Sequence, residues 1–138
     1  MGSIEVIPRG AAIGAEVRCG DLREIDDGTF GAIRAAWLDH LVLLFRGQDL
    51  DDTELTRFGQ RFGGLVVGSK RFADIRQRPA EFPYINVISN VIGADGVPIG
   101  NLGFGEAVWH TDMSMFEVPA SFTFLYGEQV QKIGRAHV

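Results

Sequence analysis

The stretch Trp109-His110-Thr111-Asp112-Met113-Ser114 holds the most informative residues of this 138-residue sequence. Side chains two residues apart on an extended segment point to the same face, so His110 and Asp112 can converge on one ion. An imidazole and a carboxylate are two of the three ligands of a facial triad, which leaves positions on Fe(II) open for a co-substrate and oxygen. The alternative is structural, with Asp112 bonding a neighbouring amide at a strand end and His110 packed beside Trp109.

Strands are expected on both sides of this segment. Residues 120–125 are predicted to form one strand, and residues 84–92 another that leads into a turn at residues 93–96. Shorter strands are predicted at residues 4–6, 13–17 and 65–67.

The first of two predicted helices follows the capping residues 26–29. Its apolar residues recur at steps of three or four and form one stripe, made of Phe30, Ile33, Trp37 and Leu41. His40 lies at the end of this helix, where a cation is favourable, so we interpret it as structural rather than as a third metal ligand. The apolar run at residues 41–45 then predicts a strand that is buried on both faces.

The second predicted helix begins with a capping box, because Asp51 can cap it and Glu54 follows three residues later. Its apolar face consists of Leu55, Phe58 and Phe62, and Gly63 with Gly64 should end it. A basic loop at residues 69–83 comes next. Together the elements favour an α+β, β-rich fold, a β-sandwich or jelly roll with two helices packed outside.

The composition excludes several classes of protein. Apolar residues make up 46% of the chain and charged residues 22%, which is typical of a globular domain. A net charge of −5 argues against a nucleic-acid partner, and no apolar run reaches the ~20 residues that span a bilayer. The single cysteine, Cys19, excludes a disulfide framework and is expected to be buried and unreactive. We therefore expect a cytoplasmic protein with no nucleic-acid and no membrane partner.

The segment around His110 resembles the iron-binding segment of the TauD/TfdA family of Fe(II)- and 2-oxoglutarate-dependent dioxygenases. Upstream, Leu44-Phe45-Arg46-Gly47-Gln48 resembles the family's early strand, which ends in a Phe-Arg-x-Gln pattern. The helix that ends in Arg61-Phe62-Gly63 also matches the family in type and order. The resemblance runs from Ile4 to about Val130.

The resemblance implies a double-stranded β-helix, the jelly-roll type of core, here incomplete and flanked by the two N-terminal helices. It implies Fe(2+), O2 and 2-oxoglutarate as co-substrate, with hydroxylation of a small, anionic organic substrate and release of succinate and CO2. His110 and Asp112 would be iron ligands, and Trp109 would pack beneath the metal strand. Met113 would lie near the substrate, with a methionine of the core as the alternative. The family's third histidine, and the threonine and arginine that hold 2-oxoglutarate, lie beyond the matching part, so we expect this chain alone to be inactive.

The last seven residues, 132–138, resemble an in-frame translation of a sequencing-adapter sequence. We therefore assign residues 1–131 to the N-terminal part of a dioxygenase domain. Residues 132–138, which include His137, are treated as a non-native tail.

Three further residues are candidates for substrate binding. Taurine-specific members of the family carry a histidine and a tyrosine where this chain has Gly68 and Arg71, so taurine is not the expected substrate. The planar fork of Arg71 suits a carboxylate or another anion, and a solvated basic loop is the alternative. Asn101 and Glu106 precede the metal segment, either directed into the pocket or serving as turn residues.

Two other interpretations stay open for the sequence. One is a cupin-like jelly roll that binds metal without oxygenase activity, and the other is a non-catalytic interaction module. For the oxygenase the expected partner is a small-molecule substrate, and the full-length protein is a candidate homo-oligomer.

Overall fold

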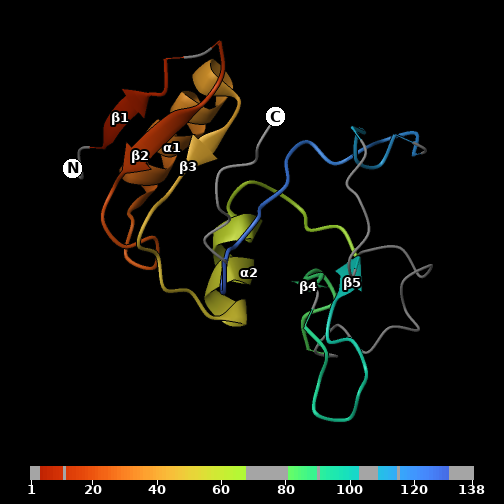
Figure 1. Cartoon of the computed structure of the whole chain (residues 1–138). Helices are drawn as coiled ribbons and strands as arrows, with labels where there is room; N and C mark the ends of the chain where they lie inside the picture. The colour runs from red at the N-terminus through yellow and green to blue at the C-terminus, as the bar shows by residue number, and fades with distance from the viewer. Residues whose placement is uncertain are drawn as a thin grey trace. The chain divides into compact units, whose positions relative to one another are not determined.

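The computed structural model describes residues 4–10, 12–67, 81–89, 91–102, 109–114 and 116–130 (Figure 1). The side chains of residues 101 and 102 lie outside this description. The chain divides into two compact units, residues Met1–Gly105 and Glu106–Val138, which we describe separately. Neither helix of the described residues is long and apolar enough to cross a membrane.

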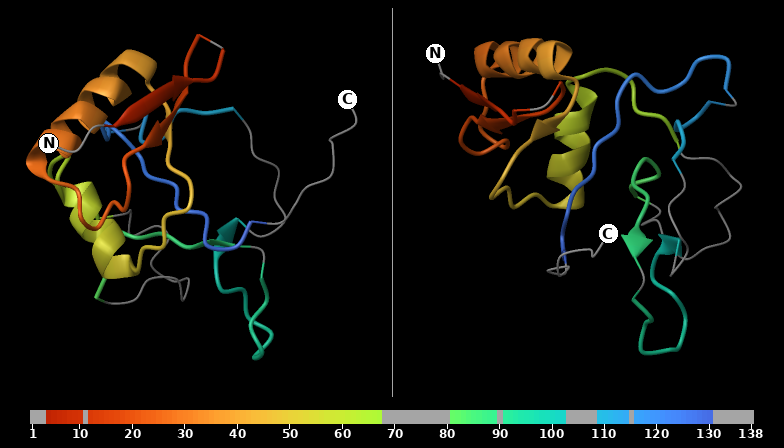
Figure 2. Two further views of the ribbon diagram at one scale, coloured as in Figure 1. Left: turned by 90° about the vertical axis from the view of Figure 1, so that its left-hand side faces the viewer. Right: turned by 45° about the horizontal axis from the view of Figure 1, so that its top comes forward.

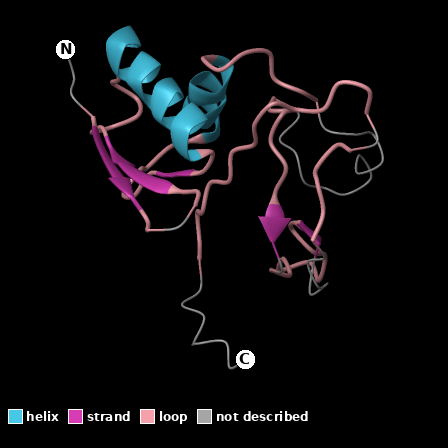
Figure 3. Cartoon of the chain, turned by 90° about the horizontal axis from the view of Figure 1, so that it is seen from above, coloured by secondary structure: helices cyan, strands magenta, loops and turns pink. Residues whose placement is uncertain are grey.

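The first unit contains a three-stranded mixed sheet. Strand β1 (Glu5–Pro8) runs antiparallel to β2 (Ala15–Arg18), and β2 runs parallel to the short edge strand β3 (Leu43–Leu44). A parallel pair needs a crossover connection, which helix α1 provides between β2 and β3. Helix α1 packs against β2 and β3 and lies on one face of this sheet (Figure 3).

Helix α1 (Asp27–His40) begins where the sequence predicts, because the side chain of Asp26 accepts a hydrogen bond of 2.7 Å from the backbone N–H of Thr29. Ile33, a residue of this helix, is completely buried. The helix ends at Leu41, whose φ of 63° is a left-handed conformation that few non-glycine residues adopt. Leu41 is 60% exposed, so the buried stripe of the helix stops before it.

Helix α2 (Asp52–Gln60) has the predicted capping box and crosses α1 rather than running parallel to it (Figure 2). Phe62, just beyond its end, meets the ring of Phe30 edge-on, with 4.8 Å between the centroids. Arg61 reaches the start of α1, where its Nη1 donates 2.9 Å to the carbonyl of Ile25 and its Nη2 lies 2.6 Å from Asp27. These contacts fix α2 against α1, and the helix stops just before the two predicted glycines.

Strands β4 (Ile88–Ser89) and β5 (Asn101–Leu102) form a second, parallel pair. The predicted turn between them is confirmed: the N–H of Gly96 donates 2.9 Å to the carbonyl of Gly93, and the N–H of Gly93 donates 2.8 Å to that of Val97. The strand predicted at residues 84–92 is shorter in the structure. Within the described residues it consists of the two residues of β4 and an isolated bridge at Ile92.

Three predicted strands are wrong in length or existence. The run at residues 41–45 gives only β3, and its exposed side chains show that it is an edge strand and not one buried on both faces. Residues 65–67 and 120–125 show no strand pairing within the described residues. Within the described residues the architecture is a small mixed sheet with two helices, and no double-stranded β-helix is formed.

Candidate metal centre

His110 and Asp112 lie in the second unit, on a stretch without regular secondary structure up to residue 111 that enters a turn at Asp112. No strand forms at these residues, but their two side chains point toward one another. The Nε2 of His110 lies 3.0 Å from the Oδ1 of Asp112. Their side chains are 66% and 63% exposed, so both remain accessible from solvent.

The separation of the two donor atoms fits a shared metal ion. Two ligands with bonds of about 2.1 Å, at a right angle around a divalent metal, stand about 3.0 Å apart. A hydrogen bond between the same two atoms requires the proton of His110 Nε2 in the absence of metal. Metal binding would displace that proton, because only the neutral imidazole nitrogen coordinates.

A third ligand is not found in the described part of the chain. No group of three histidine, cysteine or acidic side chains that could hold a metal occurs there. His40 lies in the first unit as the last residue of α1, and its carbonyl accepts 2.9 Å from the N–H of Gly14, which agrees with a structural role. His137 lies outside the described residues.

The other predicted site residues differ in how exposed they are and in whether the structure describes them. Met113 is half-buried and adopts a φ of 57° directly after the pair. Trp109 is fully exposed, so it neither packs beneath a metal strand nor against His110 in the described part of the chain. Asn101 contributes its backbone to β5, while Arg71 and Glu106 lie outside the described residues.

Two side chains of the motif at residues 44–48 form hydrogen bonds that the sequence analysis did not predict. The side chain of Gln48 accepts 2.9 Å from the N–H of Leu22 and donates 3.0 Å to the carbonyl of Gly20, which ties the end of β3 to the loop after β2. Arg46 donates its Nε to buried Glu16, 3.1 Å away. One feature of the sequence points to this ion pair: the charged residue Glu16 stands between Ala15 and Val17, two apolar residues of a predicted strand.

These features define a class of protein: a small mixed sheet with two helices, followed by an imidazole and a carboxylate whose nearest atoms lie 3.0 Å apart. The chain belongs to the taurine catabolism dioxygenase TauD, TfdA family, whose model matches residues 5–135. The resemblance seen in the sequence is thereby confirmed.

Two curated relatives name a reaction type. The (S)-phenoxypropionate/alpha-ketoglutarate-dioxygenase of Delftia acidovorans is 29% identical over 133 residues, which cover 96% of this chain and 44% of that protein. The alpha-ketoglutarate-dependent 2,4-dichlorophenoxyacetate dioxygenase of a Burkholderia species is 36% identical over 94 residues, which cover 61% of this chain and 30% of that protein. Alpha-ketoglutarate is 2-oxoglutarate, and the chain spans less than half the length of either relative.

A solved structure supports the fold assignment. A crystal structure from Burkholderia xenovorans, described as an alpha-ketoglutarate-dependent taurine dioxygenase, superposes with a TM-score of 0.52 at 34% identity. The match covers 59% of this chain and 28% of that one.

Proposed function

We propose that this chain is the part of an Fe(II)- and 2-oxoglutarate-dependent dioxygenase that supplies two of its iron ligands, His110 and Asp112. The observation that carries the proposal is the 3.0 Å approach of His110 Nε2 to Asp112 Oδ1 in a member of the TauD/TfdA family. In this proposal residues 1–131 are the front part of a jelly-roll domain, and residues 132–138 are a non-native tail.

Each ligand has a distinct role. His110 would lose its Nε2 proton and bind through that nitrogen, while the carboxylate of Asp112 would offset part of the charge of the ion. Bound Fe(II) supplies the redox chemistry that couples O2 to the decarboxylation of 2-oxoglutarate. In balance, 2-oxoglutarate, O2 and a substrate C–H bond give succinate, CO2 and a C–OH group, with one oxygen atom of O2 in succinate and the other in the hydroxyl.

For the substrate we propose a small aryloxy carboxylate. The support comes from the names of two relatives, one of phenoxypropionate and one of 2,4-dichlorophenoxyacetate. Arg71 is the candidate for the carboxylate of such a substrate, because a guanidinium binds it through two parallel hydrogen bonds. Met113, Asn101 and Glu106 are further candidates for the pocket.

The test uses the chain extended to the length of its relatives, with Fe(II), 2-oxoglutarate and phenoxypropionate. We expect succinate release with the native pair and a loss of at least ~100-fold in His110→Ala and Asp112→Ala, since each removes a ligand. Glu117→Ala, an exposed change in the same unit, is the matched control and should keep full activity.

Two results would contradict the proposal. Unchanged succinate release in both ligand variants would remove His110 and Asp112 from the metal site. Metal binding by the extended protein without any succinate release, across a panel of carboxylates, would favour the cupin-like binding module instead.

A further inference from the structure

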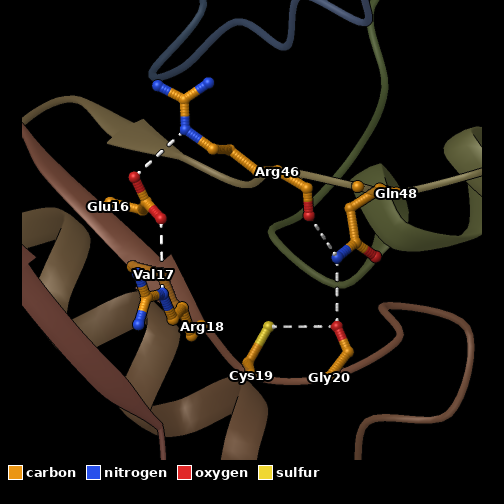
Figure 4. A pocket seen from close by; sticks show the side chains of 8 residues that line it. Glu16, Val17, Arg18, Cys19, Gly20, Arg46 and Gln48 are labelled. Atoms are coloured by element: carbon orange, nitrogen blue, oxygen red, sulfur yellow. Dashed lines mark hydrogen bonds and ion pairs between the residues drawn. The ribbon is translucent and has the colours of Figure 1, made fainter.

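A hollow of about 400 Å³ opens in the first unit, next to the parallel strands β2 and β3. It is lined by residues that follow or end these strands, among them Arg18, Gly20, Arg46 and Gln48, and by Glu16 within β2 (Figure 4). The carboxyl ends of neighbouring parallel strands are the place where open α/β sheets bind their ligands. The volume lies in the range of small-molecule sites, which run from ~300 to ~1,000 Å³.

The hollow carries a surplus of positive charge. Glu16 is only 6% exposed and its carboxylate is shared among three guanidinium groups. Arg9 forms the closest pair with it, Arg46 Nε lies 3.1 Å away and Arg18 Nε lies 3.4 Å away. Glu5 adds one more negative charge, 3.2 Å from Arg18. Arg9 and Glu5 lie outside the lining, so two cations, Arg18 and Arg46, and one anion, Glu16, line the hollow itself.

Arg46 is held in an orientation in which the two terminal nitrogens of its guanidinium group can donate hydrogen bonds to a ligand. Its Nε is engaged by Glu16, and in the described part of the chain no partner is assigned to its two terminal nitrogens. Figure 4 shows these nitrogens directed away from Glu16. The backbone of Arg46 is fixed as well, because Gln48 Nε2 donates to its carbonyl at 3.3 Å and to that of Gly20 at 3.0 Å.

We propose that this hollow is an anion site for a small carboxylate, with Arg46 as its main binding residue and Arg18 as a second cation. A carboxylate has two oxygens in one plane, which match the planar fork of a guanidinium. Glu16 acts as the positioning residue, because it holds both arginines by Nε. The site uses only residues of the first unit, so it does not depend on the proposed iron centre.

The test titrates the 138-residue chain with sodium acetate at constant ionic strength, with sodium chloride as the ionic control. Binding is followed by NMR at the arginine Nε–Hε signals and the backbone amides of Gly20 and Gly47. We expect a saturable shift with acetate that chloride does not reproduce. Arg46→Gln should weaken acetate binding at least about tenfold, and the matched control Arg34→Gln, an exposed change on α1, should leave it unchanged.

A second variant keeps the test decisive if Arg46→Gln disturbs folding. Arg46→Lys retains the charge but lacks the fork, so it should also bind acetate more weakly. The proposal is overturned by shifts that follow ionic strength alone, or by equal acetate affinity in the native chain and in a folded Arg46→Lys or Arg46→Gln variant.

Discussion

The 3.0 Å approach of His110 Nε2 to Asp112 Oδ1 depends only on local backbone geometry. One residue separates the two in the sequence, and the turn that begins at Asp112 leaves their side chains in contact. This explains how the pair could be predicted from the sequence although the surrounding strand is not formed. A third ligand would have to come from a distant part of the chain, which spacing alone cannot place.

Cys19 is less buried than its residue type and surroundings in the sequence predict. The thiol is half-buried rather than fully buried, and burial raises its pKa because the charged thiolate is poorly solvated there. The raised pKa favours the folded state below the thiol pKa of the unfolded chain. This contribution is lost as the pH rises through the higher pKa of the folded state.

We predict that iodoacetamide alkylates Cys19 several-fold more slowly in the native chain than in urea at pH 8, because less thiolate is present. The native rate should keep rising at pH values where the rate in urea has levelled off. Mass spectrometry of quenched samples measures both rates. Equal rates in the two states at pH 8 would show that the thiol pKa is not raised by folding.

Helix α2 is defined by its first turn. The carboxylate of Asp51 accepts 2.7 Å from the N–H of Glu54, and the side chain of Glu54 accepts 2.9 Å from the N–H of Asp51. The two hydrogen bonds satisfy backbone donors that the helix itself leaves without partners.

Asp51→Ala should lower the free energy of unfolding by about 1 kcal/mol, because it removes the cap of α2. Urea denaturation followed by circular dichroism measures the change. The control is Thr53→Ala, an exposed change in the same turn, which should stay within about 0.5 kcal/mol of the native chain. A loss of the same size in both variants would mean that the capping box does not stabilise α2.

Helices were predicted better than strands, and the reason is the range of the interactions. Asp26 and Asp51 start their helices through contacts three residues away, which can be read from the sequence directly. A strand needs a partner from elsewhere in the chain, and residues 120–125 find none among the described residues. Strand β3 ends its sheet for the same reason, because within the described residues no strand other than β2 pairs with it.

The chain covers 44% of its Delftia relative. Within the described residues, the large apolar side chains with the highest exposure lie in the second unit. Exposed apolar side chains gather there, with Val118 at 81%, Leu125 at 84% and Val130 at 77% exposure. Phe122 and Phe124 contact each other edge-on, with 5.4 Å between ring centroids. Apolar side chains of this size are normally covered by packing, so the segment is suited to pair with further strands.

Hydrogen exchange can test whether residues 120–125 lack strand partners in this chain and gain them in a longer one. In the 138-residue chain their backbone amides should exchange quickly, since they have no assigned strand pairing, while the amides of α1 near the buried Ile33 exchange slowly. In the chain extended to the length of its relatives, we expect residues 120–125 to become protected by at least about tenfold, while α1 changes little, because new neighbours would supply the missing hydrogen bonds. Slow exchange of residues 120–125 in the 138-residue chain itself would show that the segment is already paired, and would remove the physical basis for placing it in an incomplete jelly roll.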